Sequence, residues 1–219
     1  MPIRVAPRPN FVLVDDASLA QAAAQGQRAA AGAIWDRFSP LVRGVVRRLL
    51  GPDSEAEDLV QEVFLKLFRD IATLRDAEAL RGFILQVTTR TAMSELRRRR
   101  VRRWVGLTYD GALPEVDVRP AVDAPARLAI VALYRILDSL SVEARAAFVL
   151  HRIEEMELHD VAATMNVSLA TVKRRLADAE ARLERMASRD PALRAYVPCA
   201  TRMDDTESGS VMASKGSHA

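Results

Sequence analysis

Apolar residues recur every three or four positions along most of this chain, a period typical of α-helices. The spacing is clear in residues 17–100 and 126–186, which are separated by a segment rich in proline and acidic residues. Of the 219 residues only 9 are glycine and 10 are proline, so both stretches contain few helix breakers. The sequence therefore predicts an all-α protein with two small helical domains.

The first stretch divides into three helical segments. Residues 17–50 form one or two helices, and the sequence GPD at 51–53 ends them. Residues 54–70 form the next helix, with Ser54 as the expected N-cap, and residues 81–100 form the last. The positions expected to face inward are Ile34, Phe38, Leu41, Val45 and Leu49, then Val60, Val63, Phe64, Leu67 and Ile71, and finally Ile84, Val87, Thr91 and Leu96.

A strongly basic run closes the first stretch. Residues 94–104 read SELRRRRVRRW and place six arginines among their last eight positions, although the net charge of the whole chain is only +3. Arginines at the C-terminal end of a helix usually complement the helix dipole and face solvent. A function for this run therefore has to be inferred from its neighbours.

The helical period stops between the two stretches. The segment from 105 to 125 holds three prolines, two glycines and mainly acidic charge, which is typical of a linker. The expected organisation is an irregular arm over 1–16, a helical domain over 17–104, a flexible acidic linker over 105–125, a second helical domain over 126–188 and a disordered tail over 189–219.

The second domain contains the layout of a helix-turn-helix over residues 158–183, LHDVAATMNVSLATVKRRLADAEARL. The turn falls at Asn166 and Val167, and Ser168 is the expected N-cap of the longer second helix. The inward positions are Val161, Ala162, Met165, Val172 and Leu176. Positions on or beside the outward face, where such a helix enters the major groove of DNA, are Leu169, Thr171, Lys173, Arg174 and Arg175. A plain helical hairpin with a solvated basic face is the alternative interpretation.

Three segments together resemble the extracytoplasmic-function (ECF) group of bacterial RNA polymerase sigma factors. They are residues 56–70 (AEDLVQEVFLKLFRD), 80–100 (LRGFILQVTTRTAMSELRRRR) and 140–176 (LSVEARAAFVLHRIEEMELHDVAATMNVSLATVKRRL). The resemblance extends over approximately residues 17–188 and keeps the order and separation of the motifs. It implies that the first domain, region 2, binds polymerase and the minus-ten element, and that the second, region 4, reads the minus-thirty-five element.

The resemblance also implies a polymerase-docking face. Asp58, Gln61, Glu62, Leu65 and Arg69 form a polar stripe with one leucine along the helix 54–70, which suits docking on another protein, although helix surfaces are also polar for solubility. The positions that match the family's polymerase-binding residues are Asp58, Gln61, Glu62, Leu65 and Lys66.

DNA contacts are implied in both domains. The expected minus-ten set is Arg90, Thr91, Ser94, Glu95, Arg97, Arg98, Arg99 and Arg100, in which the last four would contact phosphates and supply affinity without reading sequence. The expected minus-thirty-five set is Ser168, Leu169, Thr171, Lys173, Arg174 and Arg175. Phe83 or Trp104 could stack on a base, or either could belong to the core.

The sequence departs from the family pattern in both domains. Phe83, Leu85 and Arg90 stand where the family commonly has tryptophan, tyrosine and asparagine, so the details of base reading do not transfer. Asp178 and Glu180 replace arginines of many relatives and should reduce phosphate attraction along the distal recognition helix. The acidic linker could either mimic nucleic acid within a basic channel of the polymerase or act as a passive tether.

Enzymatic, metal-binding and membrane functions find little support in the sequence. His151 lies at helical spacing from Glu154 and Glu155, but no second histidine or cysteine joins them at ligand spacing, so we expect no catalytic residues, metal or cofactor. The single cysteine, Cys199, excludes an internal disulfide. Because no apolar run approaches the length of a membrane span or a signal peptide, we expect a cytoplasmic protein.

We therefore expect a sigma factor that acts as a monomer within the polymerase holoenzyme, with core RNA polymerase and promoter DNA as partners and an anti-sigma factor as a further candidate. A stand-alone helix-turn-helix regulator that binds duplex DNA as a dimer is the alternative. A helical adaptor that binds only protein would leave the basic run and the helix-turn-helix unexplained.

Overall fold

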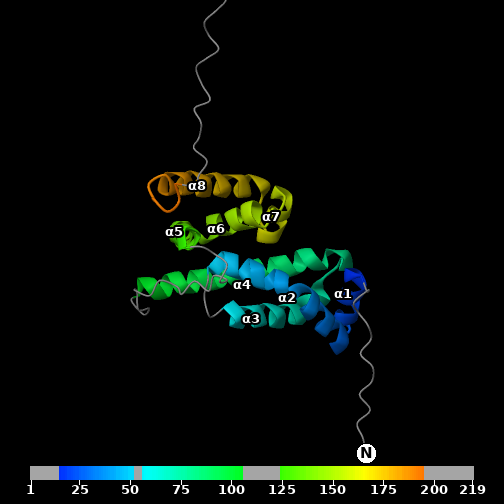
Figure 1. Cartoon of the computed structure of the whole chain (residues 1–219). Coiled ribbons are helices and arrows are strands. Elements are labelled where there is room, and N and C mark those ends of the chain that lie inside the picture. The colour runs from blue at the N-terminus through cyan, green and yellow to red at the C-terminus, as the bar shows by residue number, and fades with distance from the viewer. Residues whose placement is uncertain (1–14, 52–55, 106–123, 195–219) are drawn as a thin grey trace, which may run out of the picture.

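The computed structural model describes residues 15–51, 56–105 and 124–194. Every regular element in these ranges is helical (Figure 1), as the apolar period predicts. The elements are α1 (Asp16–Ala24), α2 (Arg28–Leu50), α3 (Ala56–Asp70), η2 (Ile71–Thr73), η3 (Ala77–Ala79), α4 (Leu80–Trp104), α5 (Ala124–Ser139), α6 (Val142–Phe148), the π-helix η4 (Val149–Ile153), α7 (Leu158–Met165) and α8 (Leu169–Ala187). Most of the expected arm, linker and tail lies outside the described residues.

Helices α1 to α4 pack together as an N-terminal bundle. The carboxylate of Asp15 caps α1, because it accepts a hydrogen bond of 2.8 Å from the backbone N–H of Ser18. Gly26, with φ of +79°, adopts the left-handed conformation that separates α1 from α2. Of the stripe predicted for α2, Ile34, Phe38, Val45 and Leu49 are buried, whereas Leu41 is half-buried.

Helix α3 packs its apolar face against α2 and α4. The ring of Phe64 lies 4.4 Å from that of Trp35 and 5.9 Å from that of Phe68, which joins α3 to α2. The expected cap of this helix, Ser54, lies outside the described residues. The stripe predicted for this segment is buried throughout, at Val60, Val63, Phe64, Leu67 and Ile71.

Helix α4 continues for 25 residues to Trp104, so the whole basic run is helical. Its buried residues occupy a much wider arc than the single stripe predicted from the sequence, and they include Leu85, Thr89 and Met93. A helix buried over so wide an arc must have neighbours on two sides. Those neighbours are α2 and α3 of the N-terminal bundle, and α6 and α7 from the other half of the chain.

Helices α5 to α8 form a C-terminal bundle. The hydroxyl of Ser141 begins α6 by accepting a hydrogen bond from the backbone N–H of Ala144 at 3.1 Å. A small core between α5, α6 and α8 contains Ile136, Leu137 and Leu183. Among the described residues, no helix has both the length and the apolarity needed to cross a bilayer.

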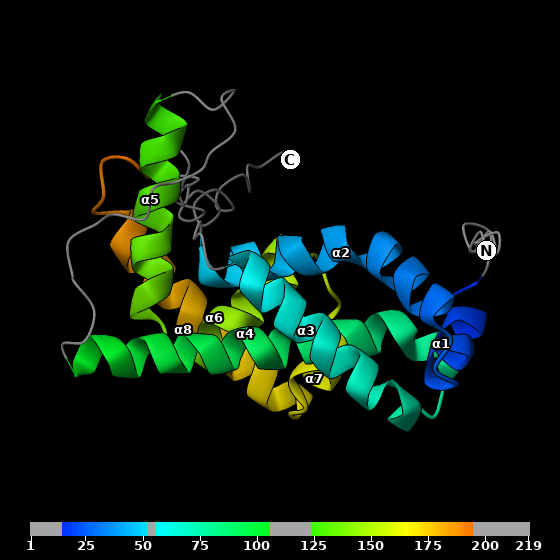
Figure 2. The ribbon, with the colours of Figure 1, turned by 90° about the horizontal axis from the view of Figure 1, so that it is seen from below.

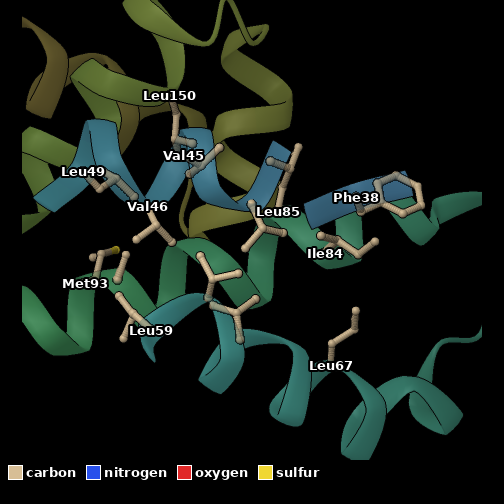
Figure 3. Packing of buried hydrophobic residues seen from close by; sticks show 14 of the residues in the cluster. Phe38, Val45, Val46, Leu49, Leu59, Leu67, Ile84, Leu85, Met93 and Leu150 are labelled. Carbon is tan, nitrogen blue, oxygen red and sulfur yellow. The ribbon is translucent and has the colours of Figure 1, made fainter. Parts of the chain in front are cut away.

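The larger apolar core belongs to both bundles. It combines Val45 of α2 and Leu85 of α4 with Val149 and Leu150 of η4, and Figure 3 shows Leu150 beside Val45. Figure 2, seen from below, shows α4 crossing in front of the C-terminal bundle, with one end of α5 beside the C-terminal part of α4. The two halves predicted from the sequence therefore share one buried interface.

A second contact fixes α5 against the end of α2. Gly51 ends α2 with φ of +94°, and the ring of Tyr134 lies against it, so that a Cβ atom on Gly51 would approach Tyr134 Cδ1 to 3.3 Å. The hydroxyl of Tyr134 donates a hydrogen bond of 3.3 Å to the carbonyl of Arg47. A larger residue at position 51 would therefore be strained by the positive φ and would require the Tyr134 ring to shift slightly.

Candidate polymerase and nucleic-acid interfaces

The outward face of α3 is open to solvent. Asp58 and Gln61 are exposed, and Leu65 is 72% exposed. Glu62 and Lys66 form an ion pair of 2.6 Å along the same helix. Figure 1 places α3 on the side of the N-terminal bundle that is remote from the C-terminal bundle. All five predicted polymerase-binding residues thus lie together on an accessible surface.

The start of α3 is held against α2 by charge. Arg43 donates a hydrogen bond of 2.7 Å to Glu57, and Arg47 lies 3.9 Å from the same carboxylate. The hydrogen bond from Arg43 holds the pKa of Glu57 below its usual value, so this carboxylate is ionised at neutral pH. Glu57 directly precedes Asp58, so the ion pair between Arg43 and Glu57 helps to position the start of the outward face.

The predicted base-reading positions of α4 separate in the structure. Arg90 is exposed and Ser94 is half-buried. Thr91 is only 3% exposed, and its hydroxyl accepts a hydrogen bond of 3.4 Å from Lys66 Nζ. Thr91 therefore faces α3, as the apolar period of the helix predicts, and its burial does not fit its expected place in the minus-ten set.

Three arginines of the basic run surround Glu95. The carboxylate of Glu95 lies 3.0 Å from Arg99, 2.7 Å from Arg102 and 3.8 Å from Arg98. Its side chain is only 12% exposed. The carboxylate is therefore engaged by cations of its own helix, and it partly neutralises the group that was predicted to contact phosphates.

The other arginines of the run face the C-terminal bundle. Arg97 donates a hydrogen bond of 2.7 Å to Glu143 of α6. Arg100 donates to the backbone carbonyl of Leu140, and Arg103 lies 3.6 Å from the carboxylate of Asp138. The basic run thus contains a locally paired group and a group that spans the two bundles.

The helix-turn-helix has the predicted geometry. Asn166 ends α7 in the left-handed conformation, with φ of 53°, and the hydroxyl of Ser168 accepts a hydrogen bond from the backbone N–H of Thr171 at 3.2 Å. Val172 and Leu176 are buried. Lys173 and Arg174 are exposed, Ser168 is exposed, and Leu169, Thr171 and Arg175 are half-buried at the surface.

The two aromatic candidates for base stacking differ in their surroundings. Trp104 is 89% exposed at the end of α4, so it does not belong to the core. Phe83 is half-buried and packs against the larger core. It also lines an open pocket between the start of α4 and the η4–α7 connection, with Met156 and Glu154 on the opposite side.

The histidine considered as a metal ligand has a structural partner. His151 Nδ1 donates a hydrogen bond of 2.8 Å to the carbonyl of Met156, while the carboxylate of Glu154 pairs with Arg48 at 2.8 Å. Burial raises the pKa of Glu154 above its usual value despite the positive charges of Arg48 and Arg81. In the described ranges, no three histidine, cysteine or acidic side chains gather as a metal site.

Comparison with known families assigns both halves of the chain. The family model of Sigma-70 region 2 matches residues 34–102, and that of Sigma-70 region 4 matches residues 130–183. The chain belongs to the sigma-70 family, in its ECF group. Region 2 thus includes most of α2 to α4, and region 4 includes most of α5 to α8.

Named relatives agree with this assignment. The chain is 33% identical over 148 residues to the ECF RNA polymerase sigma factor SigE of Mycolicibacterium smegmatis, a match that covers 65% of this chain and 57% of SigE. It is 28% identical over 172 residues to the ECF sigma factor SigM of Mycobacterium tuberculosis, covering 78% of this chain and 84% of SigM. The chain thus spans little more than half of the first relative's length.

Two solved structures share the fold. CnrH, solved in complex with the cytosolic domain of CnrY, superposes with a TM-score of 0.58 at 21% identity, covering 80% of this chain and 98% of CnrH. RpoE of Bartonella quintana, solved with the anti-sigma factor NepR, gives a TM-score of 0.56 at 20% identity, covering 71% of this chain and 95% of RpoE. These similarities establish the helical fold.

Sequence reasoning did not find the region 4 residues that contact the basic run. These residues are Asp138, Leu140 and Glu143, which lie where α5 ends and α6 begins. In the sequence this corner is marked only by the N-cap Ser141 and by the acidic residue in the first turn of α6. No local sequence pattern predicts their contact with arginines that lie about 40 residues earlier in the chain. Arg97, for example, precedes Glu143 by 46 residues.

Proposed function

We propose that the chain functions as an ECF sigma factor that binds core RNA polymerase, directs it to specific promoters and helps to melt the DNA. The observation that carries this proposal is the match to regions 2 and 4 in one chain, in that order. The open α3 face supports polymerase docking, and the exposed cations Lys173 and Arg174 of α8 support contact with duplex DNA.

We propose separate roles for the two regions. Residues 17–104 dock on polymerase through α3 and hold the minus-ten element through Arg90, Ser94 and the basic run. Residues 126–188 read the minus-thirty-five element through the start of α8. The chain would act in the cytoplasm, as a monomer within the holoenzyme, and without catalytic activity of its own. A stand-alone regulator would leave the region 2 match unexplained.

An anti-sigma factor is a further proposed partner. RpoE, whose fold this chain shares, was solved with the anti-sigma factor NepR.

In vitro transcription tests the proposed function. The full chain is mixed with bacterial core polymerase and with genomic fragments that include the DNA upstream of its own gene, and run-off transcripts are sequenced. We expect transcripts with defined start sites that core polymerase alone does not produce. Absence of such starts on every genomic template would contradict the proposal.

A matched pair of variants assigns the upstream contact in the same assay. Lys173→Ala with Arg174→Ala should reduce transcription from a responsive promoter at least about thirtyfold, because two contacts to phosphate or base, each contributing roughly 1–3 kcal/mol, are lost together. Arg185→Ala removes an exposed cation from the distal part of the same helix and should have little effect. Equal loss in both variants would mean that α8 contributes only general positive charge.

A further inference from the structure

Three arginines of the basic run lie on one face of α4 and meet one corner of region 4. Arg97, Arg100 and Arg103 are spaced by three residues, which places them along a single side of the helix. The corner that they meet comprises residues 138–143, where α5 ends and α6 begins (Figure 2). We refer to it as the α5–α6 corner.

The α5–α6 corner offers oxygen atoms to all three arginines. The carboxylate of Glu143 accepts a hydrogen bond of 2.7 Å from Arg97. Arg100 donates to the carbonyl of Leu140 and, at 3.5 Å, to that of Asp138. Carbonyl groups at the end of a helix carry partial negative charge, so the corner combines two carboxylates with a helix terminus of the same sign.

One carboxylate of the corner is held in place from behind. Arg145 is 2% exposed and contacts Oδ1 of Asp138, while Oδ2 of the same residue faces Arg103 at 3.6 Å. The guanidinium of Arg145 also lies 5.8 Å from the centre of the Tyr134 ring. The negative groups of the corner are therefore positioned before any arginine of α4 approaches.

We propose that the α5–α6 corner is an internal substitute for the DNA backbone, which occupies the phosphate-binding face of α4 while the two regions are packed together. The proposal rests on the proposed function, because it assumes that Arg97 and Arg100 contact phosphates when promoter DNA is bound. Guanidinium groups recognise carboxylate and phosphate oxygens with the same fork of N–H donors. An arginine bound to the corner is therefore unavailable to DNA.

The electrostatics of Glu143 agree with this arrangement. Burial raises its pKa, but the hydrogen bond from Arg97 and the positive charges of Arg97 and Arg175 outweigh burial and lower the pKa below its usual value. Glu143 is thus ionised at neutral pH and competes with phosphate for Arg97. Region 4 supplies this competitor, while the locally paired arginines Arg98, Arg99 and Arg102 contact Glu95 of their own helix.

Polymerase docking and DNA binding are therefore separated in the packed arrangement. The α3 face, with Asp58, Gln61 and Leu65, stays exposed. On α4, Arg97, Arg100 and Arg103 are engaged by oxygen atoms of the α5–α6 corner, although their side chains stay partly exposed. The free chain should consequently bind polymerase readily, but its α4 contacts to DNA should be weakened until regions 2 and 4 separate.

Binding to a short fluorescent DNA duplex of arbitrary sequence tests the proposal, because phosphate contacts do not depend on sequence. Glu143→Arg in the full chain should repel Arg97 and strengthen DNA binding about tenfold, and Glu143→Gln about threefold. Glu184→Arg, at an exposed position of α8, makes the same charge change away from the corner and is the control. Asp138 is not substituted here, because its loss would leave the buried Arg145 without its carboxylate.

Small-angle X-ray scattering of the same variants separates opening from added charge. Glu143→Arg and Arg97→Glu should each increase the radius of gyration, although the first strengthens DNA binding and the second weakens it. The swapped pair, Arg97→Glu with Glu143→Arg, should return the radius toward the native value. Equal DNA binding in Glu143→Arg and Glu184→Arg, or no recovery in the swapped pair, would overturn the proposal.

These outcomes are distinct from failure of the proposed function. If the chain does not initiate transcription with polymerase, the sigma-factor proposal fails, whatever the scattering shows. If transcription succeeds and Glu143→Arg neither opens the chain nor strengthens DNA binding, only the role of the α5–α6 corner is rejected.

Discussion

At the scale of single residues, Arg145 shows how strongly burial constrains a charge. It is almost fully buried, contacts the carboxylate of Asp138, and has two nitrogen atoms, Nε and Nη2, without a hydrogen-bond partner. Burial lowers the pKa of Arg145, although the negative charge of Asp138 raises it. Burial of this cation therefore reduces the stability of the folded chain. The buried cation is tolerated only while the carboxylate of Asp138 lies beside it.

We therefore expect Asp138→Asn to reduce the free energy of unfolding by about 2 kcal/mol, less than for a fully buried pair because Asp138 is partly exposed. Adding Arg145→Met should recover most of the loss, since it removes the unpaired cation and keeps an apolar side chain of similar length. Urea unfolding measures both changes. Asp178→Asn, an exposed site on α8, is the control, and an equal loss there would rule out a special role for the Asp138–Arg145 pair.

At the scale of elements, the buried face of α3 is predicted more fully from the sequence than that of α4. Every position of the stripe predicted for residues 54–71 is buried, because α3 buries one face and its outward face is polar, but the prediction missed the buried Leu59. Of the stripe predicted for α4, Ile84, Thr91 and Leu96 are buried and Val87 is half-buried, and the stripe is incomplete. Its second buried face includes Thr89, and a buried threonine gives no hydropathy signal.

The open face of α3 leads to a prediction about docking. Asp58→Ala with Gln61→Ala should weaken the complex with core polymerase about tenfold, because interface energy is concentrated in few residues around an apolar centre such as Leu65. Titration of labelled chain with core polymerase measures this change. Gln21→Ala with Asp36→Ala removes the same two side-chain types from exposed positions on α1 and α2 and should leave affinity unchanged. Undiminished affinity in the α3 variant would show that polymerase binds elsewhere.

At the scale of the whole molecule, the sequence predicted the parts correctly but not their packing. Helical periods, caps and the helix-turn-helix are local patterns, and chain order identified both regions. The contacts between the regions, such as Arg97 with Glu143 and Arg48 with Glu154, join residues 46 and 106 positions apart. No local pattern specifies which of many arginines will meet which acid, so these contacts required the structure.

A shared core should make regions 2 and 4 energetically coupled, and Val45 with Leu150 tests this directly. Both are fully buried and lie beside each other across the interface (Figure 3). We expect Val45→Ala and Leu150→Ala each to lower the free energy of unfolding by roughly 1–4 kcal/mol. Because the two cavities would merge, the double variant should deviate from additivity by at least about 0.5 kcal/mol.

The control for this cycle is Val45→Ala with Leu183→Ala. Leu183 lies in the smaller core of the C-terminal bundle, so its effect should add to that of Val45 within about 0.5 kcal/mol. Urea unfolding of all variants by circular dichroism supplies the free energies. If the Val45 and Leu150 changes are as additive as the control pair, regions 2 and 4 are separate in solution and the packed arrangement is not the main state of the free chain. Coupling in the first pair alone would mean that separating the regions for DNA binding requires energy from polymerase or from the promoter itself.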